Sequence, residues 1–189
     1  MYLNSKEPFF TMFDREKLIL SNFSDFEERK ISDLKGYFLN EAIRQKMEYD
    51  NNTIVYKVYK QNVPHEEGEL LHCITIIEPG NVDGEFFMTK GHYHVNENCA
   101  EIYYGQSGMG LLIMQNGNRV EKIEMNAGTI AYIPAGWGHR TVNIKESEPF
   151  VFFSIWPAQS GYNYQKSIDE PFKCRVFRKN NGYELKYFI

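Results

Sequence analysis

A series of short apolar or alternating runs begins near residue 53, and this feature most constrains the fold. The runs are TIVYKVYK, LLHCITIIE, EFFMTKGHYH, AEIYYGQSG, MGLLIMQ, RVEKIEM, GTIAYIP, RTVNI, PFVFFSIWP and KCRVFRK. Segments rich in Gly, Asn and Pro, such as EPGNVDG and PAGWG, separate them. Short strands at this spacing predict a sandwich or barrel of antiparallel strands. The pair Asn116-Gly117 predicts a hairpin with a type I′ turn.

The first 50 residues have a different pattern. Apolar residues recur there at mixed spacings of three and four, from Leu34 to Met47, which predicts one or two short amphipathic helices interrupted near Gly36. We therefore expect a helix-containing extension over residues 1–52, which packs on the barrel or on a partner subunit. Residues 53–189 form the barrel, and the whole chain is one globular unit.

Composition excludes several classes of protein. The chain has 189 residues, 42% of them hydrophobic, which suits one domain with a packed core. The net charge is -4 and no run of like charge reaches five residues, so we expect no nucleic-acid partner. No window approaches 18 apolar residues, so we expect no membrane association and a cytoplasmic location. Three cysteines without a CxxC pair indicate neither a disulfide framework nor a thiolate zinc site.

The stretch GHYHVNENCAEIYYG gathers the residues that carry chemistry. His92 and His94 are two residues apart, so in a strand both imidazoles point to the same face. The turn-forming NEN that follows allows Glu101 to lie opposite them, and His139 follows the turn PAGWG. Three imidazoles and one carboxylate suit a divalent ion such as Fe, Mn, Ni, Co or Zn, with positions left for substrate or water.

A second pattern makes this interpretation specific. Residues 128 to 143 read G-x5-P-x-G-x2-H-x3-N, which resembles the second motif of the cupin superfamily. The first cupin motif matches from His92 to Gly108, except that the spacer before Glu101 is longer than usual and the initial Gly is displaced. The resemblance implies a mainly β fold, the cupin double-stranded β-helix or jelly-roll barrel, with the short N-terminal helices added to it.

The longer spacer points to one branch of the superfamily. The segment EFFMTKGHYHVNENCAEIY resembles the signature E-x3-T-x-G-H-x-H-x6-E-x-Y of the cupin-type, or archaeal-type, glucose-6-phosphate isomerases. The signature positions are Glu85, Thr89, Gly91, His92, His94, Glu101 and Tyr103. A second family signature is met by Pro134, His139 and Asn143, with Ala135 where another Pro is expected. The resemblance extends from about residue 36 to residue 164.

The resemblance implies interconversion of glucose 6-phosphate and fructose 6-phosphate, a step of glycolysis and gluconeogenesis, with one divalent metal ion per subunit, Fe2+ first among the candidates. Hydrogen moves between C1 and C2 by one of two routes. In the enediol route Glu101 is the general base. In the hydride route the metal polarises the carbonyl and Glu101 is mainly a ligand. Tyr103 shares the face of Glu101 and bonds the sugar or Glu101, and the sequence does not select between the routes.

For the phosphate, the family pattern points to hydroxyls and backbone N–H groups. The substrate-binding candidates are Tyr56, Thr75, Thr89, Gly91 and Tyr164. Lys90 and Arg140 alternate with site residues, so we expect both at the solvated surface. The family often has Tyr at the position of Trp156 and His at that of Tyr162, which leaves the contacts at that end of the pocket open.

Other interpretations compete with the isomerase. A three-His, one-Glu site also suits an Fe-dependent cupin dioxygenase, although such an enzyme does not need Thr-x-Gly before the HxH. A non-enzymatic sugar-binding cupin is the alternative from another class, and mannose 6-phosphate is an alternative substrate. His65 and His72 match no motif, so we expect neither to bind metal. The run FVFFSIWP is predicted as core or dimer interface, and we expect a homodimer.

Overall fold

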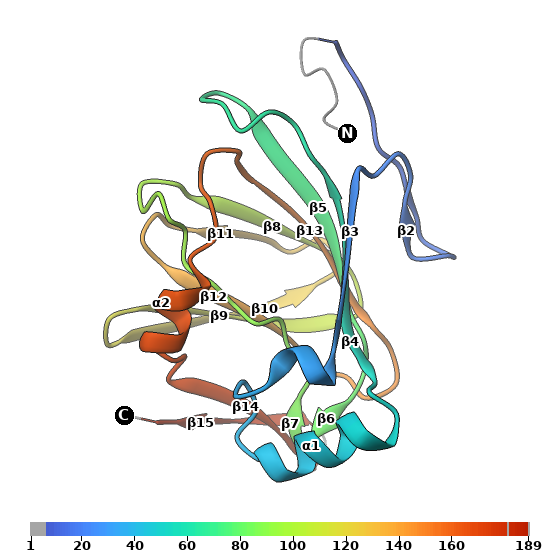
Figure 1. Ribbon diagram of the computed structural model, residues 1–189, viewed down its shortest axis with the longest axis vertical. Coiled ribbons are helices and arrows are strands. Elements are labelled where there is room, and N and C mark those ends of the chain that lie inside the picture. Colours follow the sequence, from blue (N-terminus) through green and yellow to red (C-terminus); the bar gives the residue numbers. More distant parts are fainter. Residues whose placement is uncertain (1–6, 181, 189) are drawn as a thin grey trace.

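Five of the ten predicted strands pair, together with one that was not predicted, into one antiparallel sheet with the strand order β11-β8-β13-β5-β4-β3 (Figure 1). The computed structural model describes residues 7–180 and 182–188. The strands of this sheet are β3 (Asp25–Lys30), β4 (Ile54–Gln61), β5 (Leu70–Ile77), β8 (Glu101–Ser107), β11 (Ile130–Ile133) and β13 (Phe150–Pro157). The apolar run predicted as core or interface is β13, which lies between β8 and β5 and is largely buried.

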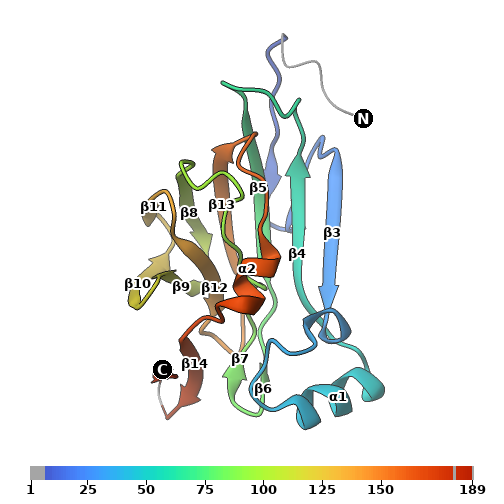
Figure 2. The same cartoon turned by 60° about the vertical axis from the view of Figure 1, so that its left-hand side comes forward.

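Two smaller sheets close the barrel opposite the large sheet (Figure 2). One contains β10 (Arg119–Asn126), β9 (Met109–Asn116) and β12 (Gly138–Asn143). The other contains β15 (Gly182–Tyr187), β14 (Cys174–Lys179), β7 (Glu85–Phe86) and β6 (Asn81–Val82). The main apolar cluster joins the sheets, with Leu111 and Leu112 of β9 packed in the same core as Phe150 and Phe152 of β13. The predicted fold class, a cupin jelly-roll barrel, is confirmed.

The N-terminal segment contains both predicted and unpredicted elements. The helix α1 (Glu41–Asp50) confirms the predicted amphipathic helix, and its N-cap Asn40 accepts a hydrogen bond from the Ile43 N–H at 3.1 Å. The region before Gly36 is a single 3-10 turn, η1 (Ile31–Leu34). The strands β1 (Phe13–Asp14), β2 (Ile19–Leu20) and β3 were not predicted, and β3 pairs with β4 at the sheet edge. The boundary at residue 52 stays a prediction.

The hairpin between β9 and β10 is confirmed, but its turn type was predicted wrongly. Asn116 pairs with Arg119, so the two turn residues are Gly117 and Asn118. Gly117 has a φ of 58°, whereas Asn118 is not among the described residues with positive φ. A type I′ turn needs positive φ at both central residues, and a Gly at the first position matches a type II′ turn.

A second helix, α2 (Tyr164–Asp169), was not predicted and lies beside the mouth of the barrel (Figure 1). Asn163 caps it by accepting a hydrogen bond from the Lys166 N–H at 2.9 Å. Neither α1 nor α2 is long and apolar enough to cross a membrane, and the same is true of every helix in the described residues.

Candidate metal centre

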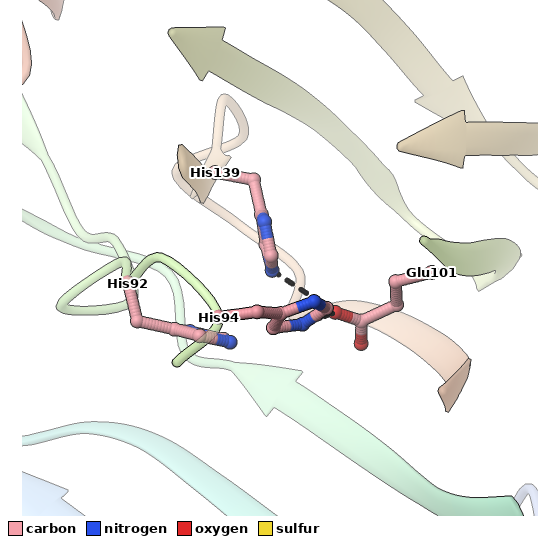
Figure 3. A group of neighbouring side chains, drawn as sticks. All are labelled: His92, His94, Glu101 and His139. Carbon is pink, nitrogen blue, oxygen red and sulfur yellow. Dashed lines mark hydrogen bonds and ion pairs between the residues drawn. The ribbon is translucent and has the colours of Figure 1, made fainter. Parts of the chain in front are cut away.

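The four predicted ligands converge inside the barrel, as Figure 3 shows. One ligand atom from each of His92, His94, Glu101 and His139 lies within 4.8 Å of the others. Glu101 is the first residue of β8, and His139 belongs to β12. His92 and His139 exchange backbone hydrogen bonds of 3.1 and 3.0 Å in an isolated bridge. His92 and His94 are therefore not in a regular strand as predicted, although their side chains do reach one site.

The histidine rings are oriented by the backbone. His94 Nδ1 lies 3.0 Å from the Cys99 carbonyl oxygen, and His139 Nδ1 lies 3.2 Å from that of Trp137. A ring N–H that donates to a carbonyl leaves the lone pair on Nε2. Both Nε2 atoms face one carboxylate oxygen, Glu101 Oε2, at 3.2 Å for His94 and 3.0 Å for His139 (Figure 3).

The electrostatics favour a charged carboxylate with a neutral histidine beside it. Burial alone would raise the pKa of Glu101, but its close contacts with His139 and His94 outweigh burial and lower it to about 2. Burial, followed by the charge of His139, holds the pKa of His92 well below its usual range. His92 Nε2 is buried and has no hydrogen-bond partner in the described residues.

These features fit a divalent cation. Lone pairs of Nε2 atoms and a carboxylate oxygen that face each other require protons or a cation between them, and the orphaned His92 Nε2 lacks any other partner. Three imidazoles and a carboxylate are ligands that Fe, Mn, Ni, Co and Zn accept. Neither His65 nor His72 belongs to the group, and His72 lies 3.0 Å from the Thr11 hydroxyl instead.

A cleft opens directly on this cluster and encloses about 610 Å³ of empty space, including open solvent at its mouth. Its lining contains every residue that the sequence predicted for substrate, namely Tyr56, Thr75, Thr89, Gly91 and Tyr164, together with Tyr103. The Thr89 hydroxyl oxygen accepts a hydrogen bond from the Thr141 N–H at 3.1 Å, so its own proton remains available to a ligand. The structure thus brings the two predicted groups of residues together, and their individual roles stay predictions.

Tyr103 lies between the metal ligands and the barrel core. Its ring stands edge-on to His139, with ring centroids 5.7 Å apart, and packs against Phe152 at 4.7 Å. Burial, reinforced by the charge of Glu101, raises the pKa of the Tyr103 hydroxyl well above its usual value. No hydrogen bond joins Tyr103 to Glu101 in the described part of the chain, so its proton is retained for another acceptor.

The prediction for Lys90 and Arg140 was wrong. Lys90 is half-buried and lines the cleft. Only 5% of the surface of Arg140 is exposed. Strand alternation predicted that both face solvent. Around Lys90, however, only Met88, His92 and Tyr93 form isolated bridges, and β12, which carries Arg140, is buried on both faces. Arg140 packs on Phe172, with its guanidinium 4.6 Å from the ring centroid. Phe172 is distant from Arg140 along the chain, so no local sequence pattern indicates this contact.

Sequence analysis did not identify several other residues that line the cleft. They are Glu27, Val58, Lys60, Cys73, Phe152 and Ser154. Glu27 belongs to the unpredicted β3, and Lys60 lies 5.4 Å from the centroid of the Tyr162 ring. Trp156 and Tyr162, the two departures from the family pattern, also line the cleft, and Tyr162 stands edge-on to His92 at 4.9 Å between centroids.

A β-barrel with three histidines and one glutamate converging in its interior defines a metal-site cupin. Residues 28–185 match the sequence model of the family described as Glucose-6-phosphate isomerase (GPI). A glucose-6-phosphate isomerase of Thermococcus litoralis is 38% identical over 96% of this chain and 95% of its own length. That of Thermococcus kodakarensis is 44% identical over 80% of each. The chain belongs to the glucose-6-phosphate isomerase family.

Solved structures are similar to part of the chain at a lower level. A deletion mutant of Bacillus subtilis oxalate decarboxylase aligns with a TM-score of 0.46 and 25% identity. This alignment covers 59% of the present chain and 28% of that chain.

Proposed function

We propose that this protein interconverts glucose 6-phosphate and fructose 6-phosphate at a metal centre held by His92, His94, Glu101 and His139. The observation that carries the proposal is that two groups of residues line one cleft. Three of the four candidate metal ligands, His92, Glu101 and His139, line it, and hydroxyl and amide donors suited to a phosphate line it too. The relatives named as glucose-6-phosphate isomerases support the same substrate.

Residues of this chain supply the proton chemistry. In the enediol route, Glu101 takes the proton from C2 of the open-chain aldose and returns it to C1 of the enediol, while a proton moves from the C2 hydroxyl to the C1 oxygen. Its low pKa keeps Glu101 ionised, and the same low pKa makes the carboxylate a weak base. The neutral Tyr103 hydroxyl donates to a sugar oxygen as charge develops there. In the hydride route, Glu101 is mainly a metal ligand or an orienting group instead.

We propose Fe2+ as the resident ion, with Mn2+, Ni2+, Zn2+ and Co2+ as alternatives that the donor set also accepts. A bound divalent ion supplies Lewis acidity to the sugar carbonyl and the adjacent hydroxyl. Tyr56, Thr75, Thr89, Gly91 and Tyr164 are proposed to bind the substrate, with the phosphate at the hydroxyls and the Gly91 N–H.

The test is a coupled assay with fructose 6-phosphate as substrate and glucose 6-phosphate detected by its dehydrogenase. Purified protein is stripped with chelator and then loaded with each metal in turn. We expect activity to vanish on stripping, to return with metal and to be greatest with Fe2+. No activity in protein shown to contain one metal per chain contradicts the proposal, and oxygen uptake then tests the dioxygenase alternative.

A matched pair of variants links the activity to the metal ligands. His139→Ala removes a buried ligand, so we expect loss of bound metal by elemental analysis and a fall in kcat of at least about a hundredfold. His72→Ala removes a half-buried histidine outside the cluster and retains both metal and activity. Equal metal content in the two variants would contradict the assignment of His139.

Two further properties belong to the proposal. We place the enzyme in the cytoplasm, in glycolysis and gluconeogenesis, and the three free cysteines are compatible with a reducing compartment.

We also propose a homodimer. Exposed apolar side chains share the outer face of β8 and β11, namely Ile102, Tyr104, Ile130 and Tyr132. Light scattering at micromolar concentration tests this state, and a monomer mass contradicts it.

A further inference from the structure

Arg140 is a buried cation whose hydrogen bonds go to one backbone carbonyl. Its Nε and Nη2 donate to the Lys90 carbonyl oxygen at 3.2 and 2.8 Å, across 50 residues of sequence. Within the described residues no carboxylate pairs with it. The guanidinium lies between two rings, 4.6 Å from the centroid of Phe172 and 5.8 Å from that of Tyr37. Two donors on one oxygen hold that carbonyl in a fixed direction.

The direction of the Lys90 carbonyl determines where the Gly91 N–H points. The two groups belong to one peptide plane, and the chain has no cis peptide bond among the described residues. In a trans peptide the C=O and N–H point in opposite directions. With the carbonyl turned toward Arg140, the Gly91 N–H faces away from Arg140, and Gly91 lines the cleft. No acceptor in residues 7–180 and 182–188 is hydrogen-bonded to that N–H.

The other side of Gly91 is filled by protein. Gly91 has a φ of +73°, and a Cβ built on it would lie 2.7 Å from Phe172 and 2.9 Å from the Arg140 Cβ. The Ser167 hydroxyl of α2 donates to the Tyr164 carbonyl at 2.7 Å, and its oxygen lies 3.4 Å from the Gly91 carbonyl oxygen. Arg140 and Phe172 therefore hold the loop from behind, while its free N–H faces the cleft. A buried N–H without a protein acceptor is expected to find one in a ligand.

The neighbouring groups indicate what kind of acceptor this is. The Thr89 hydroxyl retains a proton for donation, and Tyr56, whose hydroxyl stays protonated because burial raises its pKa, lines the same cleft. Successive donors at one place suit an anionic oxygen. We propose that Arg140 is a positioning residue that aims the Gly91 N–H at a phosphate oxygen of the substrate. This inference rests on the proposed function for the identity of the phosphate ester.

The test separates phosphate binding from the metal end of the cleft. Arg140→Met keeps an apolar stem without donors, Arg140→Lys keeps the charge without the paired donors, and Arg178→Met removes an exposed arginine of β14 as the control. The probes are glucitol 6-phosphate and glucitol, which share the polyol and differ in the phosphate. Inhibition constants, KM, kcat and metal content are measured on each metal-loaded variant.

In Arg140→Met we expect KM for fructose 6-phosphate and the inhibition constant of glucitol 6-phosphate to rise about tenfold to a hundredfold. We expect kcat to change less than about threefold and glucitol inhibition to be unchanged. Arg140→Lys is intermediate, and Arg178→Met matches wild type. An unchanged inhibition constant for glucitol 6-phosphate in metal-loaded Arg140→Met overturns the inference, as does an equal weakening of glucitol.

A measurement on wild type keeps the inference testable if the variants do not fold. In zinc-loaded protein, the Gly91 amide proton is expected to move downfield on addition of glucitol 6-phosphate and not of glucitol. A Gly91 resonance that stays in place at saturation overturns the inference. A wild-type protein that binds glucitol 6-phosphate through Gly91 but does not isomerise fructose 6-phosphate contradicts the proposed function alone.

Discussion

At the scale of single residues, Gly91 links the two groups of residues that line the cleft. Its neighbour His92 is a candidate metal ligand, and its own N–H faces the proposed phosphate position. Residues with a Cβ rarely adopt a φ of +73°, and Phe172 already occupies the space behind Gly91. Both constraints act on the same position, so this glycine is required for the shape of the site.

We predict that Gly91→Ala lowers the free energy of unfolding by roughly 2–4 kcal/mol, because backbone strain and overpacking of the core add. Gly117→Ala is the matched control, since Gly117 also has positive φ, +58°, but nothing lies within 4 Å of its added Cβ. We expect only the strain cost there, about 1–2 kcal/mol. Urea denaturation of both variants measures the difference, and equal losses would show that the contact with Phe172 does not matter.

The site residues differ in how far the sequence predicts them. His92, His94, Glu101 and His139 lie in two motifs whose spacings are local, and the structure brings all four together. Arg140 depends on the Lys90 carbonyl, 50 residues away, and on a ring from the C-terminal segment. A pattern of alternating faces cannot detect such a partner, because the segment around Lys90 is held by isolated bridges and has no regular alternation.

At the scale of elements, strands with a strong apolar pattern were predicted and those without it were missed. The ten predicted runs, which form β4, β5 and strands from β7 to β14, alternate or are largely apolar, since they face the core. In contrast, β3 reads DFEERK and lies at the sheet edge, where five charged residues are tolerated and mimic a helix surface. The helix α2 has only six residues, too few for a helical period to show.

The strands β7 and β14 are joined to the segment before α1 by a buried ion pair. Glu85 is 1% exposed and accepts hydrogen bonds from Arg175 Nη1 at 2.8 Å and from the Leu39 N–H at 2.7 Å. Arg175 also donates to the Tyr37 carbonyl at 2.9 Å. This network fixes residues 37–39 against the barrel, so the first position of the isomerase signature acts through structure and not through contact with the cleft.

We predict that Arg175→Met destabilises the fold by about 3 kcal/mol, because it leaves the Glu85 carboxylate buried without its cation. Arg178→Met is the control on the same strand, since Arg178 pairs with Glu146 at an exposed position, where the loss is at most about 1 kcal/mol. Thermal and urea denaturation compare the two variants. A loss for Arg175→Met no larger than that of the control would show that the buried pair does not stabilise the fold.

At the scale of the whole molecule, the barrel encloses several weak acids in its cleft. Burial raises the pKa of the Cys73 thiol to about 11 and that of Tyr164 to about 12, and it raises the pKa values of Tyr56 and Tyr162 further. The same enclosure that prepares the cleft for a ligand therefore keeps these groups protonated. The consequence is a dependence of stability on alkaline pH that belongs to the fold as a whole.

The sign of this pH dependence follows from the number of protons that each state binds. In the unfolded chain the thiol ionises near pH 9 and the phenols near pH 10. Between these values and the raised folded values, the native state binds more protons than the unfolded state, so stability falls as pH rises. We predict a melting temperature that is steady to about pH 9 and then declines through pH 11. Cys73→Ser and Tyr162→Phe each remove one buried acid, so both variants decline less steeply than wild type in calorimetric scans. Absorbance at 295 nm shows whether tyrosine ionisation accompanies unfolding, and slopes equal to wild type in both variants contradict the prediction.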